Sequence, residues 1–66
     1  MSLARQVAMY LLKEEANLGP THIGRLLGGR DHSTVLKNTA KIARLLDLDS
    51  HLRRDVLNIR EGLASQ

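Results

Sequence analysis

Residues 28–36 read Gly-Gly-Arg-Asp-His-Ser-Thr-Val-Leu, a glycine pair followed by a polar helix start and then by apolar residues. Two consecutive glycines favour a turn at the end of a helix, because glycine adopts left-handed backbone conformations without steric strain. Asp31 is a good N-cap for the helix that follows. The segment therefore predicts two helices joined by a short turn. The first turn of the second helix would present a carboxylate, an imidazole and two hydroxyls.

These polar side chains suit the recognition of DNA bases. Two helices joined in this way have the proportions of a helix-turn-helix, in which the second helix enters the major groove and reads bases with its N-terminal residues. Asp31 can accept a hydrogen bond from the amine of cytosine, and His32 can donate one to a purine N7 or to a carbonyl. The hydroxyls of Ser33 and Thr34 can bond a base or a phosphate. A plain N-cap and an ordinary surface histidine are the alternatives for the first two residues.

The chain before this turn predicts two helices. The first is expected over about residues 4–17, because apolar side chains recur there at helical spacing. The second is expected over about residues 20–27. Pro20 suits its first position, where a missing N–H is not needed, and Gly19 can serve as its N-cap. Gly24 would let another backbone approach this helix closely.

The chain after the turn predicts two more helices. One begins after Asp31, and its inner face is expected to span most of its length. That face consists of Val35, Ile42 and Leu46, with Leu36, Thr39 and Ala43 beside them. A break with a capping residue follows at residues 48–50, and the other helix ends near Ala64. Its apolar stripe consists of Leu52, Val56, Ile59 and Leu63. No segment alternates as a strand does, so the expected fold is an all-α four-helix domain.

Length and residue types limit the chemistry of the chain. Its 66 residues have room for one small domain, residues 1–66, and none for an ATPase. There is no cysteine, and the three histidines, at positions 22, 32 and 51, lack the spacing of a metal motif. Consecutive helical residues point about 100° apart, so Asp31, His32 and Ser33 cannot form a catalytic relay. We therefore expect a protein that is not an enzyme, with no metal and no cofactor.

Hydropathy gives an expectation for location. The apolar runs are too short for a membrane span or for the core of a signal peptide, so a cytoplasmic protein is expected. With DNA as its partner, it is expected to associate with the nucleoid. Residues 1–3 precede the first patterned segment. They are interpreted as an expression remnant without a role of its own.

Charge is distributed unevenly along the chain. The formal net charge is +3, and residues 1–44 carry seven basic against three acidic residues. This asymmetry favours a polyanion as the partner of the N-terminal two-thirds, although a mildly basic solvated surface would look the same. The side chains expected to contact phosphates are Arg5, Lys13, Arg30, Lys37 and Lys41.

Several stretches form a recognisable set: Arg5-Gln6, Ala8-Met9-Tyr10-Leu11, Ile23-Gly24 and above all residues 28–36. Together they resemble the C-terminal DNA-binding domain of the bacterial replication initiator family DnaA, over about residues 4–63. The resemblance implies an all-helical fold related to the Trp repressor. It also implies binding of double-stranded DNA at short origin sequences called DnaA boxes, and we expect this chain to be a monomer.

The same resemblance implies roles for individual residues. It places base contacts on Asp31, His32 and Ser33. It places contacts to the DNA backbone on Thr34, Arg5, Gln6, Lys13 and Lys37. Pro20 and Thr21 fall where the family touches thymine methyl groups. Ser33 stands where the family usually has threonine, so a methyl that could meet a thymine methyl is missing and specificity is expected to shift.

The family also has parts that these 66 residues lack. They are an upstream helix, a basic loop whose arginine enters the minor groove, and a nucleotide-binding domain. The chain is therefore expected to be either a fragment of a full initiator, with the rest of that protein as its partner, or a shortened relative. The alternative function is a protein-interaction module that keeps the fold and pairs the apolar stripe of the last helix with another helix. Ordinary core packing is the more common explanation of such a stripe.

Overall fold

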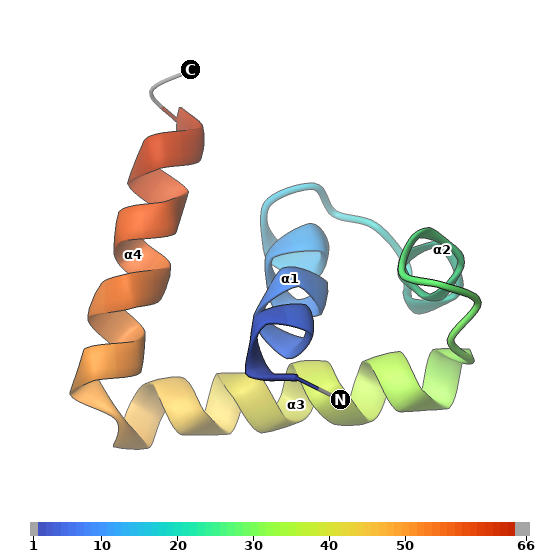
Figure 1. Ribbon diagram of the computed structural model, residues 1–66, viewed down its shortest axis with the longest axis horizontal. Helices are drawn as coiled ribbons and strands as arrows, with labels where there is room; N and C mark the ends of the chain where they lie inside the picture. The colour runs from blue at the N-terminus through green and yellow to red at the C-terminus, as the bar shows by residue number, and fades with distance from the viewer. Residues whose placement is uncertain (1, 65–66) are drawn as a thin grey trace.

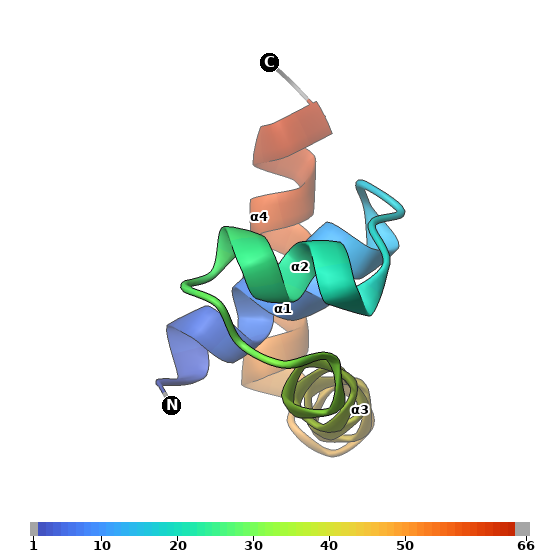
Figure 2. The ribbon, with the colours of Figure 1, turned by 90° about the vertical axis from the view of Figure 1, so that its right-hand side faces the viewer.

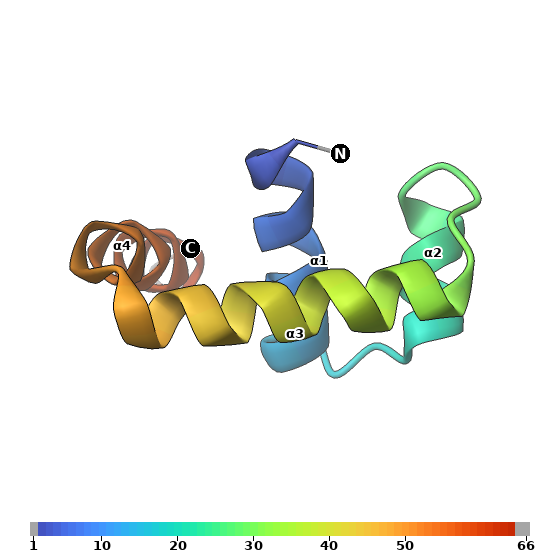
Figure 3. The same ribbon diagram turned by 90° about the horizontal axis from the view of Figure 1, so that it is seen from below.

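Four helices follow one another in the computed structural model, which describes residues 2–64. They are α1 (Leu3–Glu14), α2 (Pro20–Leu26), α3 (His32–Leu48) and α4 (Ser50–Ala64). The long helix α3 forms the base, and it contacts each of the other three. Helix α2 lies across its N-terminal end, α1 crosses it near the middle, and α4 rises steeply from its C-terminal end (Figure 1, Figure 3). The predicted all-α four-helix fold is confirmed.

The first helix ends earlier than the sequence predicted. It was expected to reach about residue 17, but it stops at Glu14. Asn17 has a φ of +55°, and the N–H of Leu18 donates to the carbonyl of Leu12 at 3.2 Å. Asparagine is one of the few residues besides glycine that adopts this left-handed conformation, which closes the end of a helix. The polar end of the first expected helix is therefore its C-terminal cap.

The start of this helix is also capped. The hydroxyl oxygen of Ser2 accepts a hydrogen bond from the backbone N–H of Arg5 at 3.3 Å, and Leu3 is the first residue of α1. The expectation that residues 1–3 have no role of their own is wrong for these two residues, while Met1 lies outside the described residues. An N-cap serine satisfies an N–H that the helix itself leaves without a partner.

Within residues 2–64, the core consists of two apolar clusters, one on each side of α1. The first cluster contains Val7, Ile42 and Val56, and so joins α1, α3 and α4. The second contains Met9, Ile23 and Val35, and so joins α1, α2 and α3. Helix α1 therefore packs on two sides, with Val7 in one cluster and the fully buried Met9 in the other.

The inner faces of the last two helices are shorter than predicted. On α3, Leu36 and Ala43 were placed beside the inner face, but both are exposed. On α4, Val56 is buried, whereas Ile59 and Leu63 are 45% and 52% exposed. The reason is geometric: α4 rises away from the end of α3, so α3 does not cover its C-terminal half (Figure 1).

Polar contacts secure α4 at both of its ends. Asp49 caps its start, because its Oδ1 accepts from the N–H groups of His51 and Leu52 at 3.0 and 3.1 Å. The break with a capping residue predicted at residues 48–50 is thereby confirmed. Farther along, the guanidinium of Arg60 forms an ion pair with Glu15 and lies 5.9 Å from the ring centroid of Tyr10. These contacts hold the helix where apolar packing is thin.

The connection between α2 and α3 depends on a close backbone approach. The N–H of Arg30 donates to the carbonyl of Gly24 at 2.9 Å, and a Cβ on residue 24 would lie 2.0 Å from the carbonyl oxygen of Arg30. Only a residue without a side chain fits there, as the sequence predicted. Gly28 and Gly29, with φ of +92° and +74°, turn the chain back toward α2.

Helix α3 begins at a strong cap. The Oδ1 of Asp31 accepts from the N–H of Ser33 at 2.6 Å, from the hydroxyl of Ser33 at 2.6 Å and from the N–H of Thr34 at 3.3 Å. The hydroxyl of Ser33, followed by the two N–H groups, lowers the pKa of Asp31 below its ordinary value of 3.8. All three donors favour the ionised carboxylate, so it is charged near neutral pH.

We expect Gly24→Ala to destabilise the domain, because the new methyl group meets the Arg30 carbonyl rather than a flexible side chain. The free energy of unfolding should fall by about 1–3 kcal/mol. The matched control is Gly62→Ala, at a position on α4 with open space around it, which should raise stability by up to about 1 kcal/mol. Urea denaturation followed by circular dichroism measures both. Equal effects of the two substitutions would contradict the close approach.

Acid should weaken the domain partly through Asp31. Its pKa is lower in the folded than in the unfolded state, so its contribution to stability is complete above its ordinary value of 3.8 and is lost as the pH falls through the folded value. Asp31→Asn keeps an oxygen acceptor that does not titrate. Between pH about 6 and about 2.5, urea unfolding should show a larger loss of stability in the wild type than in this variant. Parallel pH profiles of the two proteins would argue against the effect.

Candidate nucleic-acid interface

Helices α2 and α3 form a helix-turn-helix. The short α2 lies across the N-terminal end of α3, and in Figure 2 the view runs along α3 with α2 and α1 on the same side of it. The chain between the two helices, residues 27–31, is slightly longer than the tightest turns of this kind. It leads directly into the polar residues 31–34, here called the recognition turn, at the free end of α3.

The recognition turn is open to solvent. Asp31, His32 and Ser33 are exposed, and Thr34 is half-buried. The cap uses Oδ1 of Asp31, while its other oxygen, Oδ2, accepts no hydrogen bond among the described residues. The predicted capping role of Asp31 is thus present, and it leaves one carboxylate oxygen available to a partner.

The cap also determines whether the Ser33 hydroxyl donates or accepts hydrogen bonds. An ionised carboxylate can only accept, so the Ser33 hydroxyl must donate its proton to Asp31. The serine oxygen then offers only lone pairs to the outside. The recognition turn therefore presents two acceptors, Asp31 Oδ2 and Ser33 Oγ, beside the imidazole of His32, which can donate.

Basic side chains continue from the recognition turn along α3. Lys37, Lys41 and Arg44 follow at helical steps of four and three residues, are all exposed, and are here called the basic face. Together with Gln6 and Asn38 they line a shallow hollow between α3 and α1. Arg44 was not among the residues expected to contact phosphates, although its spacing from the two lysines was a usable signal. Arg30 is exposed in the turn ahead of α3.

The three residues of α1 that were predicted to contact DNA differ in their exposure to solvent. Arg5 and Lys13 are exposed near opposite ends of the helix, about 12 Å apart along its axis. Gln6 is only 6% exposed, and its Nε2 donates to Oδ1 of Asn38 on α3 at 2.9 Å. Its side chain is therefore occupied inside the domain, unlike those of the other residues expected to meet the DNA backbone.

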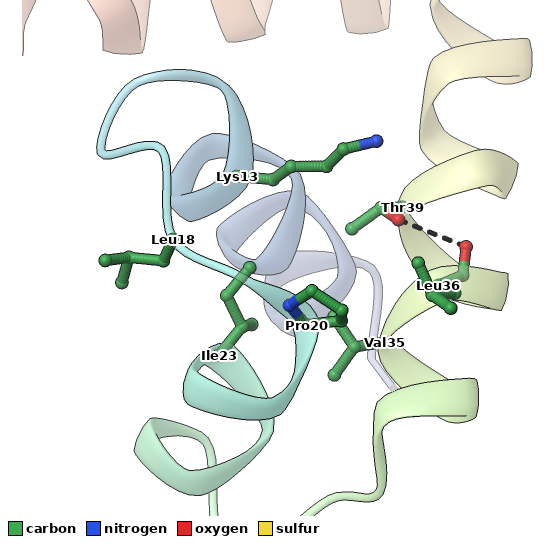
Figure 4. A pocket seen from close by; sticks show the side chains of 7 residues that line it. All are labelled: Lys13, Leu18, Pro20, Ile23, Val35, Leu36 and Thr39. Atoms are coloured by element: carbon green, nitrogen blue, oxygen red, sulfur yellow. Dashed lines mark hydrogen bonds between the residues drawn. The ribbon is translucent and has the colours of Figure 1, made fainter.

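The N-terminus of α2 meets α1 and α3 at a small apolar pocket. Figure 4 shows Pro20 there, with Lys13 from α1 above it and Leu36 from α3 opposite. Pro20 is half-buried and Thr21 beside it is exposed. Leu36 is 48% exposed, and its half-open side chain lies on the same surface as Pro20. Pro20 and Thr21 were predicted as site residues, but Leu36 was not, since it was placed beside the inner face of α3.

The described residues offer little for other kinds of site. Within residues 2–64, no three His, Asp or Glu side chains are grouped so that they could hold a metal ion. None of the helices in this range is long and apolar enough to cross a membrane.

Comparison with known proteins identifies the family. The family model described as the bacterial dnaA protein helix-turn-helix matches residues 1–42. The chromosomal replication initiator protein DnaA of Chloroflexus aggregans is 58% identical over 59 residues, which cover 89% of this chain and 12% of that protein. The same protein of Thermomicrobium roseum is 52% identical over 61 residues, which cover 92% of this chain and 13% of that protein. No solved structure matches the chain. This chain belongs to the bacterial DnaA helix-turn-helix family, and membership of that family implies DNA binding.

Proposed function

We propose that this domain binds double-stranded DNA at DnaA-box-like sites of a replication origin, with the recognition turn in the major groove. The observation that carries the proposal is the recognition turn itself, in which Asp31, His32 and Ser33 are exposed side by side on the first turn of α3. Helices that read the major groove contact bases with these N-terminal positions. The relatives are named as chromosomal replication initiators, which favours an origin as the target.

The polarity of the recognition turn suggests which base edges it takes. Asp31 Oδ2 and Ser33 Oγ are acceptors, so they fit the exocyclic amines of cytosine or adenine. His32 can donate to a purine N7 or to a carbonyl of guanine or thymine. We therefore infer that two amines and one acceptor are read within neighbouring base pairs.

Phosphate contacts would surround this base-reading centre. Lys37 and Lys41 lie on α3 beyond the recognition turn, Arg30 lies before it, and Arg5 and Lys13 lie on α1. The N–H groups at the start of α3 add a positive end to the same surface, although Asp31 already occupies those of Ser33 and Thr34. In this proposal Thr34 contacts the backbone through its hydroxyl. Pro20 and Thr21 meet thymine methyl groups from the start of α2.

The domain corresponds to a small part of the length of its relatives. It spans 12% or 13% of the length of the matched initiators. We propose that it supplies the part that finds the DNA site, in the cytoplasm where the chromosome lies.

A protein-interaction module is a second candidate, favoured by the exposed apolar side chains of α4. Leu57, Ile59 and Leu63 are each about half exposed there. Sedimentation velocity over a range of concentrations distinguishes the two functions. A mass that stays that of one chain, together with DNA affinity at low salt, supports the DNA-binding function. A mass that rises with concentration, without DNA affinity, supports the interaction module.

The base-reading role of His32 can be tested directly. We expect His32→Ala to reduce the preference for a labelled DnaA-box duplex over a scrambled duplex by up to about tenfold, because one hydrogen bond contributes about 0.5–1.5 kcal/mol and about 1.4 kcal/mol corresponds to tenfold. His51→Ala, at an exposed histidine on α4, is the matched control and should keep the preference. Fluorescence anisotropy measures both affinities. An unchanged preference in the His32 variant would contradict the proposed orientation.

The basic face should act through phosphates rather than bases. Lys41→Ala should weaken binding to the box and scrambled duplexes by the same factor, and reduce the slope of log affinity against log salt by about 0.9. Arg54→Ala removes one positive charge from α4 instead and should change this slope much less. The same titrations at several salt concentrations give the slopes. If Lys41→Ala lowered only the affinity for the box, the phosphate assignment would be wrong.

A further inference from the structure

We propose that Asn38 is a positioning residue that aligns the recognition turn with α1, an inference that rests on the proposed DNA-binding function. Asn38 lies on α3, one helical turn after Thr34, and is half-buried. It does not need to touch DNA for this role. It links two elements that each carry proposed DNA contacts.

The link begins at a buried amide. Gln6 and Thr39 are the buried polar side chains among residues 2–64. Thr39 satisfies itself locally, because its hydroxyl donates to the carbonyl of Leu36 on the same helix at 3.1 Å. Gln6 instead reaches across to α3, where its Nε2 donates to Oδ1 of Asn38 at 2.9 Å, and the two residues are 32 positions apart in the chain. A buried amide without such a partner would be destabilising.

The link continues to the recognition turn. Nδ2 of Asn38 donates to the carbonyl oxygen of Thr34 at 2.8 Å. Both ends of the asparagine amide are thus in use. If the amide were flipped, its NH₂ would face the NH₂ of Gln6 and its oxygen would face the oxygen of Thr34. The network therefore permits one orientation of Asn38.

The recognition turn is in this way held from both sides. Asp31 binds its N–H groups from the N-terminal side, and Asn38 binds the carbonyl of Thr34 from the next turn. Through Gln6 the second contact also sets how α3 is rotated relative to α1. Arg5 is the neighbour of Gln6 in α1, so a phosphate contact and the base contacts share one rigid frame. Base recognition tolerates displacements of only about 0.5 Å, which makes such a frame a determinant of specificity.

The test separates orientation from stability with Asn38→Leu and with the double variant Gln6→Leu/Asn38→Leu. The single variant leaves the buried Gln6 amide without its partner and should be less stable than wild type. The double variant replaces both polar groups by apolar ones, which recovers stability. Both should lower the ratio of box to scrambled affinity about fivefold to tenfold, with unchanged affinity for the scrambled duplex. Asn58→Leu, at an exposed asparagine on α4, is the matched control and should keep the ratio.

Two results would overturn the proposal. One is a stable double variant that keeps the wild-type ratio. The other needs no DNA: in the free wild-type domain, proton NMR should show NOEs between the side-chain amide of Gln6 and the side chain of Asn38, and their absence would exclude the link. A wild type that binds both duplexes equally would instead reject sequence-specific binding, while the NMR result would still decide whether Gln6 and Asn38 connect the helices.

Discussion

One close contact places the recognition turn: the carbonyl of Arg30 occupies the space that a side chain on residue 24 would need. Glycine has no side chain to fill that space, so the chain can fold back against α2 and enter α3 directly afterwards. The angle between the two helices of the helix-turn-helix follows from this approach. The position of Asp31 follows too, since it comes directly after the folded-back residue. The carboxylate then organises the start of α3 and the donors and acceptors that it presents.

Helix α3 joins this local arrangement to the rest of the domain. Its N-terminal end carries the recognition turn, its middle packs on α1, and its C-terminal end leads to α4. Packing in both core clusters therefore fixes the position of one long helix, and with it the position of the recognition turn at its exposed end. The polar link from Gln6 through Asn38 adds a directional contact where apolar packing alone would let α3 rotate.

Local signals in the sequence were sufficient to predict those features that depend on residues close together in the chain. The glycine turn, the proline start of α2 and the cap at Asp31 were all predicted, and they follow from backbone preferences. Features that depend on how helices cross were not predictable in this way. Burial of Gln6 requires Asn38 to lie opposite it, and exposure of Ile59 requires α4 to leave α3 at a particular angle. The early end of α1 is an intermediate case, because asparagine at residue 17 indicates a helix end less strongly than glycine would.

The division of the core into two clusters has a consequence for evolution. The cluster of Met9, Ile23 and Val35 supports the helix-turn-helix, whereas the cluster of Val7, Ile42 and Val56 anchors α4. The two clusters share α1 and α3, but no residue belongs to both. A substitution at Val56 would therefore alter the anchorage of α4 first and leave the side chains that support the helix-turn-helix unchanged. Sequence change in α4 is in this way compatible with constant packing beneath the recognition turn.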